Sequence, residues 1–321
     1  MAGVEKSQSP HFMRGVICSL LGAVLWGFSG TCAQLLLSQY HIPVLFIVCI
    51  RMISAGLLFL IVILISKRKV LIEVLKSPKT LLQLTVFGVC GFFLCHLTYL
   101  MCIDYTNAGT ATVLQCLGIL FVMIYTCLYA RRLPRVRETV GFLLAAGSTF
   151  IIATHANPAV LVLPLPGLLW GIACGLAVAF YMIFPKALLI RWGSLIVTGL
   201  GMLIGGIVVN IVLRPWTMSV TLEPGSLAAL AAIVLFGTFA AFYLYLQGIA
   251  DIGPLRASLL GAAEPVSATI FSWAWLGTHF PLIDCVGFAL MIAMVFLVTN
   301  DKPAAVRPDV EDPALRERKT G

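Results

Sequence analysis

The sequence predicts an all-α integral membrane protein of ten transmembrane helices, arranged as two inverted repeats of five helices. Three observations carry this prediction: an apolar composition, a train of long apolar runs, and a second half that repeats patterns of the first. Of the 321 residues, 60% are hydrophobic and only 11% are charged, whereas a soluble domain carries about 25% charged residues. Lipid is therefore the predicted surrounding of most of the chain.

Ten apolar runs are long enough to cross a bilayer as helices, which takes roughly 20 residues. They are predicted as helices because backbone polar groups cannot stay unpaired in lipid and the runs lack the alternation of barrel strands. The predicted spans are 14–37, 42–66, 81–103, 107–129, 138–154, 166–187, 194–213, 227–248, 254–276 and 282–299.

The two halves share short patterns at a constant spacing. Residues 25–27 (Leu-Trp-Gly) recur at 169–171, and residues 107–109 (Asn-Ala-Gly) are echoed at 251–253 by Asp-Ile-Gly. Internal repeats set the architecture of a chain. Because five helices is an odd number, the second half enters the membrane from the opposite side, which makes the repeats inverted.

The repeats give a division of the chain into segments. The first repeat is predicted over 14–154 and the second over 166–299, with an external loop at 155–165 between them. Residues 1–13 are predicted as a cytoplasmic N-terminus, and residues 300–321 as a disordered cytoplasmic tail of mixed charge.

The net charge of +8 is distributed unevenly between the two sides of the predicted topology. Of the 21 basic residues, all lie on one side except Arg214, on the other side, and Arg51, inside a span. The positive-inside rule then places both termini in the cytoplasm and predicts a multi-pass protein of the cell membrane. A charge arranged in this way points to the lipid bilayer as partner and excludes nucleic acid.

The cysteines and glycines indicate packing between helices and give no sign of a bound cofactor. The ten cysteines lie almost wholly inside the spans, where they behave as small soft hydrophobes. Zinc-type spacings and a disulfide framework are absent, so neither a metal nor another cofactor is predicted. Glycines four apart, at 171 and 175 and again at 201 and 205, favour close packing within one chain over a dimer contact; both monomer and homodimer remain open.

Two short sequence features, together with the predicted architecture, resemble those of a known family. Arg51 in the second span and the run Gly-Ala-Ala-Glu-Pro-Val at 261–266, set in ten spans and two inverted repeats, resemble the drug/metabolite transporter superfamily. The EamA-type branch fits best, over about residues 14–299. The Gly-Glu that often closes the fourth and ninth helices of that branch is replaced here by Ala130-Arg131 and Gly277-Thr278-His279. The resemblance implies transport of amino acids or related metabolites, by export as often as by uptake.

Two ionisable residues lie deep in predicted spans. An ionisable side chain costs free energy inside a bilayer, so each is expected to have a structural or functional role. Arg51 is about 12 Å from the outer start of its helix and Glu264 about 15 Å from the inner start of its own. In a core of about 30 Å the two depths differ by about 3 Å. The two side chains are therefore predicted to lie near one level, as a structural ion pair or as substrate ligands. A third interpretation has Glu264 titrate and couple transport to protons.

A proline and four deep aromatic residues complete the candidate site. Pro265 removes a backbone donor and is predicted to break the helix beside Glu264. Trp26 and Trp170 occupy matching positions in the two repeats, and Tyr99 and Tyr181 also lie deep. These rings either fill gaps in the core or form the wall of a cavity for an organic substrate.

The predicted function is a secondary transporter that moves a small organic metabolite by alternating access, with proton coupling as an option. A pump is excluded because no Walker-type loop is present. The chain is not predicted to be an enzyme, since nucleophile and metalloprotease motifs and a second deep carboxylate are missing. A passive channel or facilitator is the first alternative, ahead of an intramembrane enzyme or a receptor; neither a channel nor a receptor needs inverted repeats.

Overall fold

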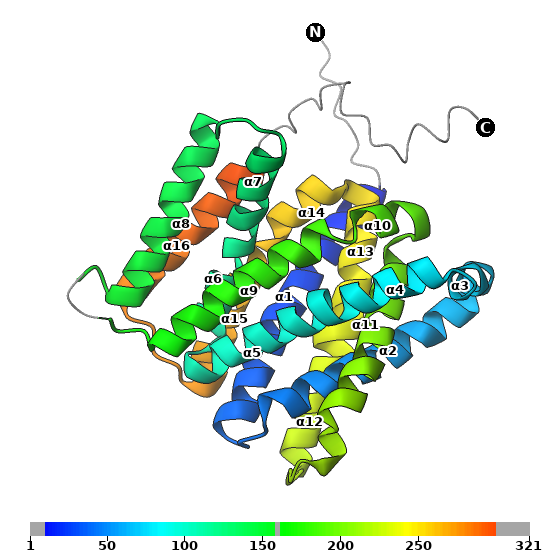
Figure 1. Cartoon of the computed structure of the whole chain (residues 1–321). Coiled ribbons are helices and arrows are strands. Elements are labelled where there is room, and N and C mark those ends of the chain that lie inside the picture. The colour runs from blue at the N-terminus through cyan, green and yellow to red at the C-terminus, as the bar shows by residue number, and fades with distance from the viewer. Residues whose placement is uncertain (1–9, 158–160, 300–321) are drawn as a thin grey trace.

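The computed structural model describes residues 10–157 and 161–299, and every secondary-structure element in them is a helix (Figure 1). The predicted tail at 300–321 and residues 1–9 of the predicted N-terminal segment lie outside the described residues. Residues 10–13 belong to the first helix, which therefore begins before the predicted start at 14.

The elements of the first half run from residue 10 to residue 154. In order they are α1 (Pro10–Ser38), α2 (Val44–Ser66), α3 (Arg68–Leu75), α4 (Pro78–Val86), the π-helix η1 (Phe87–Phe93), α5 (Leu94–Tyr105), α6 (Ala108–Gln115), α7 (Leu117–Tyr129) and α8 (Val136–Thr154).

The second half continues from residue 165. Its elements are α9 (Leu165–Ile183), α10 (Lys186–Trp192), α11 (Ser194–Leu213), the 3-10 helix η2 (Pro215–Thr217), α12 (Pro224–Val234), the π-helix η3 (Leu235–Ala240), α13 (Ala241–Ile252), α14 (Pro254–Gly261), α15 (Ala263–Leu276) and α16 (Leu282–Thr299).

Eight helical stretches of the described residues are long and apolar enough to cross a membrane, some of them with a local interruption. They correspond to the first eight predicted spans, with the third and eighth extended to Pro78–Tyr105 and Pro224–Ile252. A shorter apolar helix, Leu282–Val298, matches the tenth. The ninth predicted span, 254–276, is divided between α14 and α15.

Polar caps and prolines explain where several helices begin. Ser77 accepts a hydrogen bond from the backbone N–H of Thr80 at 3.4 Å ahead of α4, and Asn107 accepts one from that of Thr110 at 2.8 Å ahead of α6. Such caps satisfy donors that have no partner inside the helix. Gly253, with φ of 82°, separates α13 from α14, a conformation that glycine adopts without strain.

The two halves contain elements of matching length. Helices α5 and α13 both have 12 residues, and α6 and α14 both have 8. A π-helical segment precedes α5 as η1 and α13 as η3. Each half therefore presents the same local irregularities in the same order.

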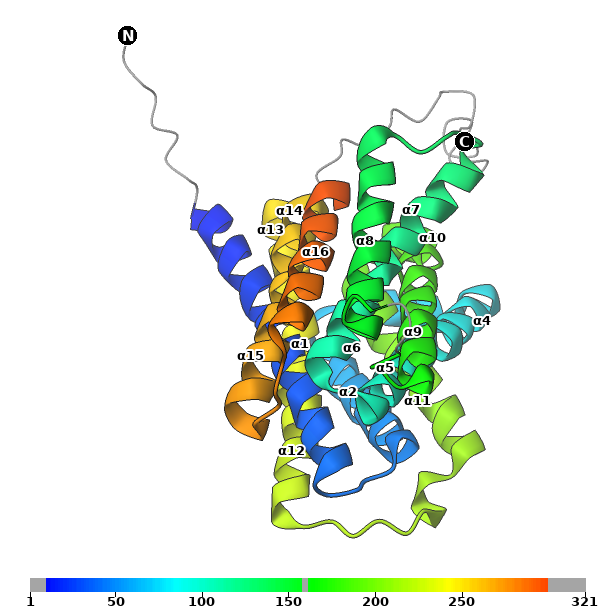
Figure 2. The same ribbon diagram turned by 90° about the vertical axis from the view of Figure 1, so that its left-hand side faces the viewer.

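The helices also pack in matching pairs. Helix α1 lies against α13 and α15, while α9 lies against α5 and α7, so that the first helix of each half packs on helices of the other half. The pairs α2–α11 and α8–α16 each join corresponding helices, and Figures 1 and 2 both show α8 beside α16. In both views α1 begins and α16 ends at the same end of the bundle.

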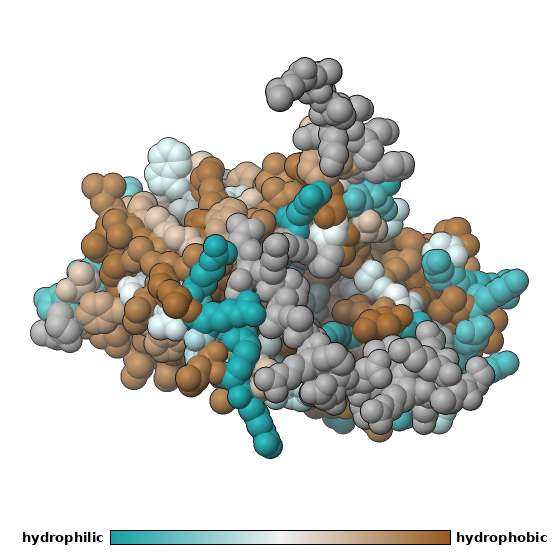
Figure 3. Space-filling view, turned by 90° about the horizontal axis from the view of Figure 1, so that it is seen from above, coloured by the Kyte–Doolittle hydropathy of each residue, from teal (hydrophilic) through white to brown (hydrophobic). Residues whose placement is uncertain are grey.

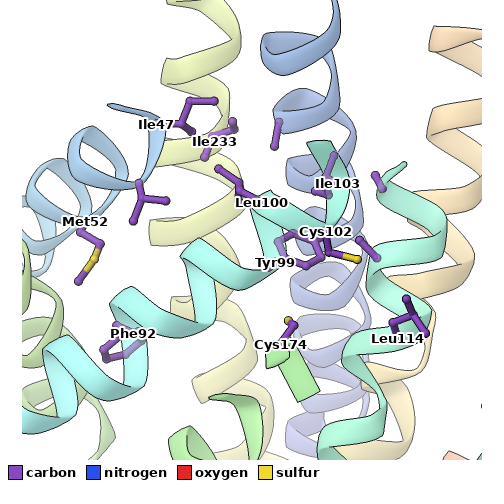
Figure 4. Packing of buried hydrophobic residues seen from close by; sticks show 14 of the residues in the cluster. Ile47, Met52, Phe92, Tyr99, Leu100, Cys102, Ile103, Leu114, Cys174 and Ile233 are labelled. Atoms are coloured by element: carbon purple, nitrogen blue, oxygen red, sulfur yellow. The ribbon is translucent and has the colours of Figure 1, made fainter. Parts of the chain in front are cut away.

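Small residues allow these pairs to approach closely. A side chain at Gly88 of η1 would meet the Cα atom of Gly205 in α11 at 2.7 Å, and one at Gly56 would meet backbone atoms of Leu203. The glycines at 171, 175, 201 and 205 all contact other helices of the same chain, as the prediction of packing within one chain requires. Figure 4 shows part of the buried core, where Leu100 of α5 lies near Ile47 of α2 and Ile233 of α12.

Candidate functional site

Two helix discontinuities lie at matching places in the halves. Helix α6 stops at Gln115 and α7 starts at Leu117; α14 stops at Gly261 and α15 starts at Ala263. The joining residues, Cys116 and Ala262, both remain near helical geometry, with ψ of −17° and −9°. Their N–H groups bond to the carbonyl three residues earlier, at 3.1 and 3.3 Å, which tightens the turn locally.

The discontinuity in the second half lies three residues before Pro265, the residue that was expected to break the helix. Pro265 is the third residue of α15, a position whose N–H would have no partner within a helix that starts there. The proline ring would clash with the carbonyl four residues earlier, that of Gly261, if the helix ran straight through. The break at Ala262 relieves this clash, so the proline begins the second helix.

A hydrogen bond joins the two discontinuities. Gln115 Nε2, at the end of α6, donates to Glu264 Oε1, at the start of α15, over 3.2 Å. Glu264 is the second residue of α15, where the free N–H groups and the helix dipole favour a negative charge. Gln115 Oε1 also accepts a weaker contact from Cys174 Sγ of α9 at 3.8 Å. The amide therefore connects α6, α9 and α15 at one point.

Arg51 does not form an ion pair with Glu264. Its Nε donates to Thr238 Oγ1 at 2.8 Å and its Nη2 to the carbonyl of Gly237 at 3.3 Å, both in η3. Salt bridges between described residues join Arg14 to Asp251, Arg132 to Glu138 and His155 to Asp284, and none of them includes Arg51 or Glu264. Arg51 thus connects α2 of the first half to the π-helix of the second.

We expect Thr238→Val to destabilise the fold, because it removes the acceptor of a buried arginine while keeping the shape of the side chain. A hydrogen bond to a charged group contributes about 1.5–3 kcal/mol. Thr238→Ser keeps the hydroxyl and serves as the matched control. The measurement is the unfolding temperature of the purified protein in detergent; equal temperatures for the valine and serine variants would contradict the role of this bond.

The candidate aromatic residues lie in different surroundings. The Trp26 ring of α1 contacts Tyr245 and Phe242 of α13, with centroids 4.7 and 5.0 Å apart. The Tyr181 ring of α9 contacts Phe92 and Phe87, at 5.2 and 5.6 Å.

Trp170 differs from its repeat counterpart Trp26. It is half-buried and packs on the hydrophobic core. Tyr99 is only 7% exposed, and its hydroxyl has no hydrogen-bond partner among the described residues.

A bridge of rings connects the two halves. Phe242 contacts Phe92 at 6.1 Å, so that Trp26, Phe242, Phe92 and Tyr181 form an unbroken series from α1 to α9. Trp26, Phe242 and Tyr181 all retain part of their surface exposed. The structure therefore brings Trp26 and Tyr181 to one aromatic wall, whereas Trp170 stays apart from it.

Three residues of this region were not among the predicted site residues. Gln115 was expected from its sequence only to hydrogen-bond to another helix, and an amide inside a long apolar run is the signal for such a contact. Tyr245 and Thr238 gave no such signal, because a tyrosine and a threonine are common in apolar helices. Among the described residues, no group of three or more histidine, cysteine or acidic side chains is arranged to hold a metal ion.

Comparisons with known proteins give a consistent result. The model of the EamA-like transporter family matches residues 13–154 and 165–300. The uncharacterized inner membrane transporter YicL of Salmonella typhimurium is 34% identical over 294 residues, which cover 92% of this chain and 98% of that protein. An uncharacterized transporter of Archaeoglobus fulgidus is 25% identical, over 90% of this chain and 100% of its own. A crystal structure with 17% identity aligns with a TM-score of 0.61 over 91% of this chain and 97% of its own, a likeness of fold alone.

Proposed function

Since the chain belongs to the EamA-like transporter family, we propose that it is a secondary transporter that exports a small organic metabolite by alternating access. The predicted resemblance to this family is confirmed by the match over both halves. The apolar helices and the inner membrane transporter among the relatives make it a multi-pass membrane protein. The proposed substrate is an amino acid or a related compound, and the proposed coupling ion is a proton at Glu264.

One observation carries this proposal: the Gln115–Glu264 bond between two interrupted helices. Transporters built from inverted repeats bind substrates and coupling ions where helices are discontinuous near the middle of the membrane. A carboxylate that is costly to place at this depth is a functional candidate for the same reason. The two interruptions, one from each half, are therefore the proposed site.

We further propose that the chain crosses the membrane ten times as two inverted repeats, 14–154 and 166–299, separated by an external loop. The matching lengths of α5 and α13 and of α6 and α14 support this. The two separate matches of the family model agree with the same division. Helix α1 begins and α16 ends at the same end of the bundle, as an even number of crossings requires.

Alternating access requires one side of the bundle to be closed, and a polar cluster around Gln34 supports closure on one side. Gln34 of α1 accepts from the N–H of Ala108 at 2.9 Å and donates to Thr278 Oγ1 at 3.0 Å, joining the start of α6 to the end of α15. At the opposite end, the described residues show no extensive packing between α7 and α14. The arrangement supports a state closed on the proposed external side.

The proposed orientation places both termini in the cytoplasm. Exposed basic residues such as Lys67, Lys69 and Arg137 lie on the proposed cytoplasmic side. Seen from the end where α1 begins, hydrophilic patches lie among hydrophobic residues (Figure 3). In a background without native cysteines, Ile72→Cys should react with an impermeant maleimide only after permeabilisation, and Val162→Cys should react in intact cells. Reaction of position 72 in intact cells would overturn the orientation.

The transport activity is tested in two steps. Metabolite profiles of cells with and without the protein identify the exported compound, and proteoliposomes then measure its flux. A carrier should saturate and show trans-stimulation, whereas a passive channel shows neither. Recovery of a chemically altered compound would instead support an enzyme.

A further inference from the structure

Glu264 is a carboxylate with spare binding capacity inside the bundle. Its Oε1 accepts from Gln115, while Oε2 accepts no hydrogen bond from the described residues. Oε2 is not one of the enclosed polar atoms that lack a hydrogen-bond partner, so part of its surface is accessible. The Glu264 side chain as a whole is partly exposed. A second ligand can therefore reach this oxygen.

No protein cation fills this place among the described residues. Arg51, the deep basic residue, is fixed to Thr238 and Gly237 of η3. Gly237 lies against Ser29 of α1, and Ser29 is three residues, about one helical turn, beyond Trp26. The guanidinium group thus bonds to a segment that lies against Ser29, one turn along α1 from Trp26, and no hydrogen bond or salt bridge joins it to the carboxylate.

Two aromatic rings lie close to the segment of the chain that carries this carboxylate. A side chain at Gly27, next to Trp26, would meet the backbone carbonyl of Glu264 at 2.7 Å, which places this part of α1 directly on the start of α15. Tyr245 Oη donates to the carbonyl of Ala257 at 3.1 Å, so its ring lies over α14, ahead of the discontinuity. The rings of Trp26 and Tyr245 are 4.7 Å apart, tilted by 51°, and both keep exposed surface.

A carboxylate beside two tilted aromatic rings has the chemistry of a site for ammonium groups. The faces of tryptophan and tyrosine attract cations through their quadrupoles, and an ammonium–carboxylate hydrogen bond is stronger than a neutral one. A carboxylate ligand would instead meet an acidic group there. We propose that Glu264, Trp26 and Tyr245 form a binding site for an organic ammonium ion with an apolar body.

This inference rests on the proposed transport function and narrows its substrate class to amines and their derivatives. Glu264 binds the ammonium group, and the two rings bind the carbon skeleton. The substrate needs no carboxylate of its own, because Arg51 is engaged by η3. Protons compete for the same carboxylate, so ammonium binding weakens as the pH falls.

The test compares three probes of one shape: phenethylammonium, 2-phenylethanol and 3-phenylpropionate. Their binding to the full chain in lipid nanodiscs is measured by isothermal titration calorimetry. We expect phenethylammonium to bind with a Kd at least about ten-fold lower than that of the alcohol, and 3-phenylpropionate not to bind. Equal binding of the ammonium ion and the alcohol, or preferential binding of the acid, would overturn the proposal.

Variants separate the roles of charge and rings. Glu264→Gln should raise the Kd of phenethylammonium about ten-fold or more, and Trp26→Leu and Tyr245→Leu should each raise it several-fold. Trp273→Leu is the matched control, because Trp273 lies on the outside of the bundle and is 63% exposed. Should one ring variant fail to fold, the other gives the answer. An unchanged Kd in Glu264→Gln refutes the site.

Transport of the same probe distinguishes this inference from the proposed function. Phenethylammonium that binds without crossing the membrane of proteoliposomes would leave the site in place and refute transport of this class. Saturable transport of another solute without ammonium binding would leave the transporter in place and refute the site.

Discussion

Replacing Glu264 by glutamine should abolish net export while leaving the protein folded and inserted. Glutamine keeps the shape of the side chain and its contact with Gln115, but it carries no charge that a proton or a substrate can neutralise. Because the carboxylate lies at the start of α15 and contacts the end of α6, its loss removes the group that both interrupted helices share. We expect net flux to fall at least about ten-fold, because the loss of a hydrogen bond to a charged group costs about 1.5–3 kcal/mol, and we expect exchange to persist.

The measurement is the extracellular accumulation of the exported metabolite, with membrane levels compared by immunoblot. Glu73→Gln is the control, since Glu73 is exposed on α3 and far along the chain from the site. Net export by Glu264→Gln with the wild-type pH profile would show that Glu264 is not the coupling group.

The second large effect is expected from Gly27→Ala, which should severely reduce the amount of folded protein. The added methyl group would meet the backbone nitrogen of Ala268 at 2.6 Å and the carbonyl of Glu264 at 2.7 Å, and would also collide with Ser267 Oγ. Backbone atoms cannot rotate away, so α1 and α15 must separate. Overpacking of this kind costs about 1–3 kcal/mol, and here it also displaces Glu264.

A glycine elsewhere in the chain provides the control for this change. At Gly147 of α8, an added methyl group would have no neighbouring atom within 4 Å, and alanine in a helix is favoured over glycine by roughly 0.5–1 kcal/mol. Gly147→Ala should therefore leave expression and the unfolding temperature unchanged or slightly higher. Equal behaviour of the two variants would contradict the close contact between α1 and α15.

Much of the fold follows from the sequence because lipid imposes simple requirements. A long apolar run has to be helical, and each of the first eight predicted spans corresponds to one helical stretch long and apolar enough to cross a membrane. Local irregularities are harder to predict. The break at Ala262 precedes Pro265 because the proline acts on the carbonyl one turn earlier, and the break at Cys116 has no proline or glycine at the joining residue to mark it.

The site is less predictable than the fold, because depth along a helix does not define direction around it. Arg51 and Glu264 lie at similar predicted depths, yet Arg51 bonds to η3 and Glu264 bonds to Gln115. Likewise, Trp26 and Trp170 match in the repeat, but only Trp26 joins the aromatic wall. Such differences arise from rotation and packing of whole helices, which a single sequence does not encode locally.

The central claim is that the site between the two interrupted helices opens alternately to opposite sides of the membrane, and a pair of distances measures this directly. Spin labels at Tyr105 and Leu282 report on the proposed external side, and labels at Leu133 and Arg256 report on the cytoplasmic side; all four residues are exposed. Double electron–electron resonance in lipid nanodiscs measures the distance within each pair of labels. The distances are compared between the wild-type protein and Glu264→Gln, which mimics the neutralised carboxylate. The account predicts that one distance grows while the other shrinks. Distances that stay constant, or that change in the same direction, would contradict it.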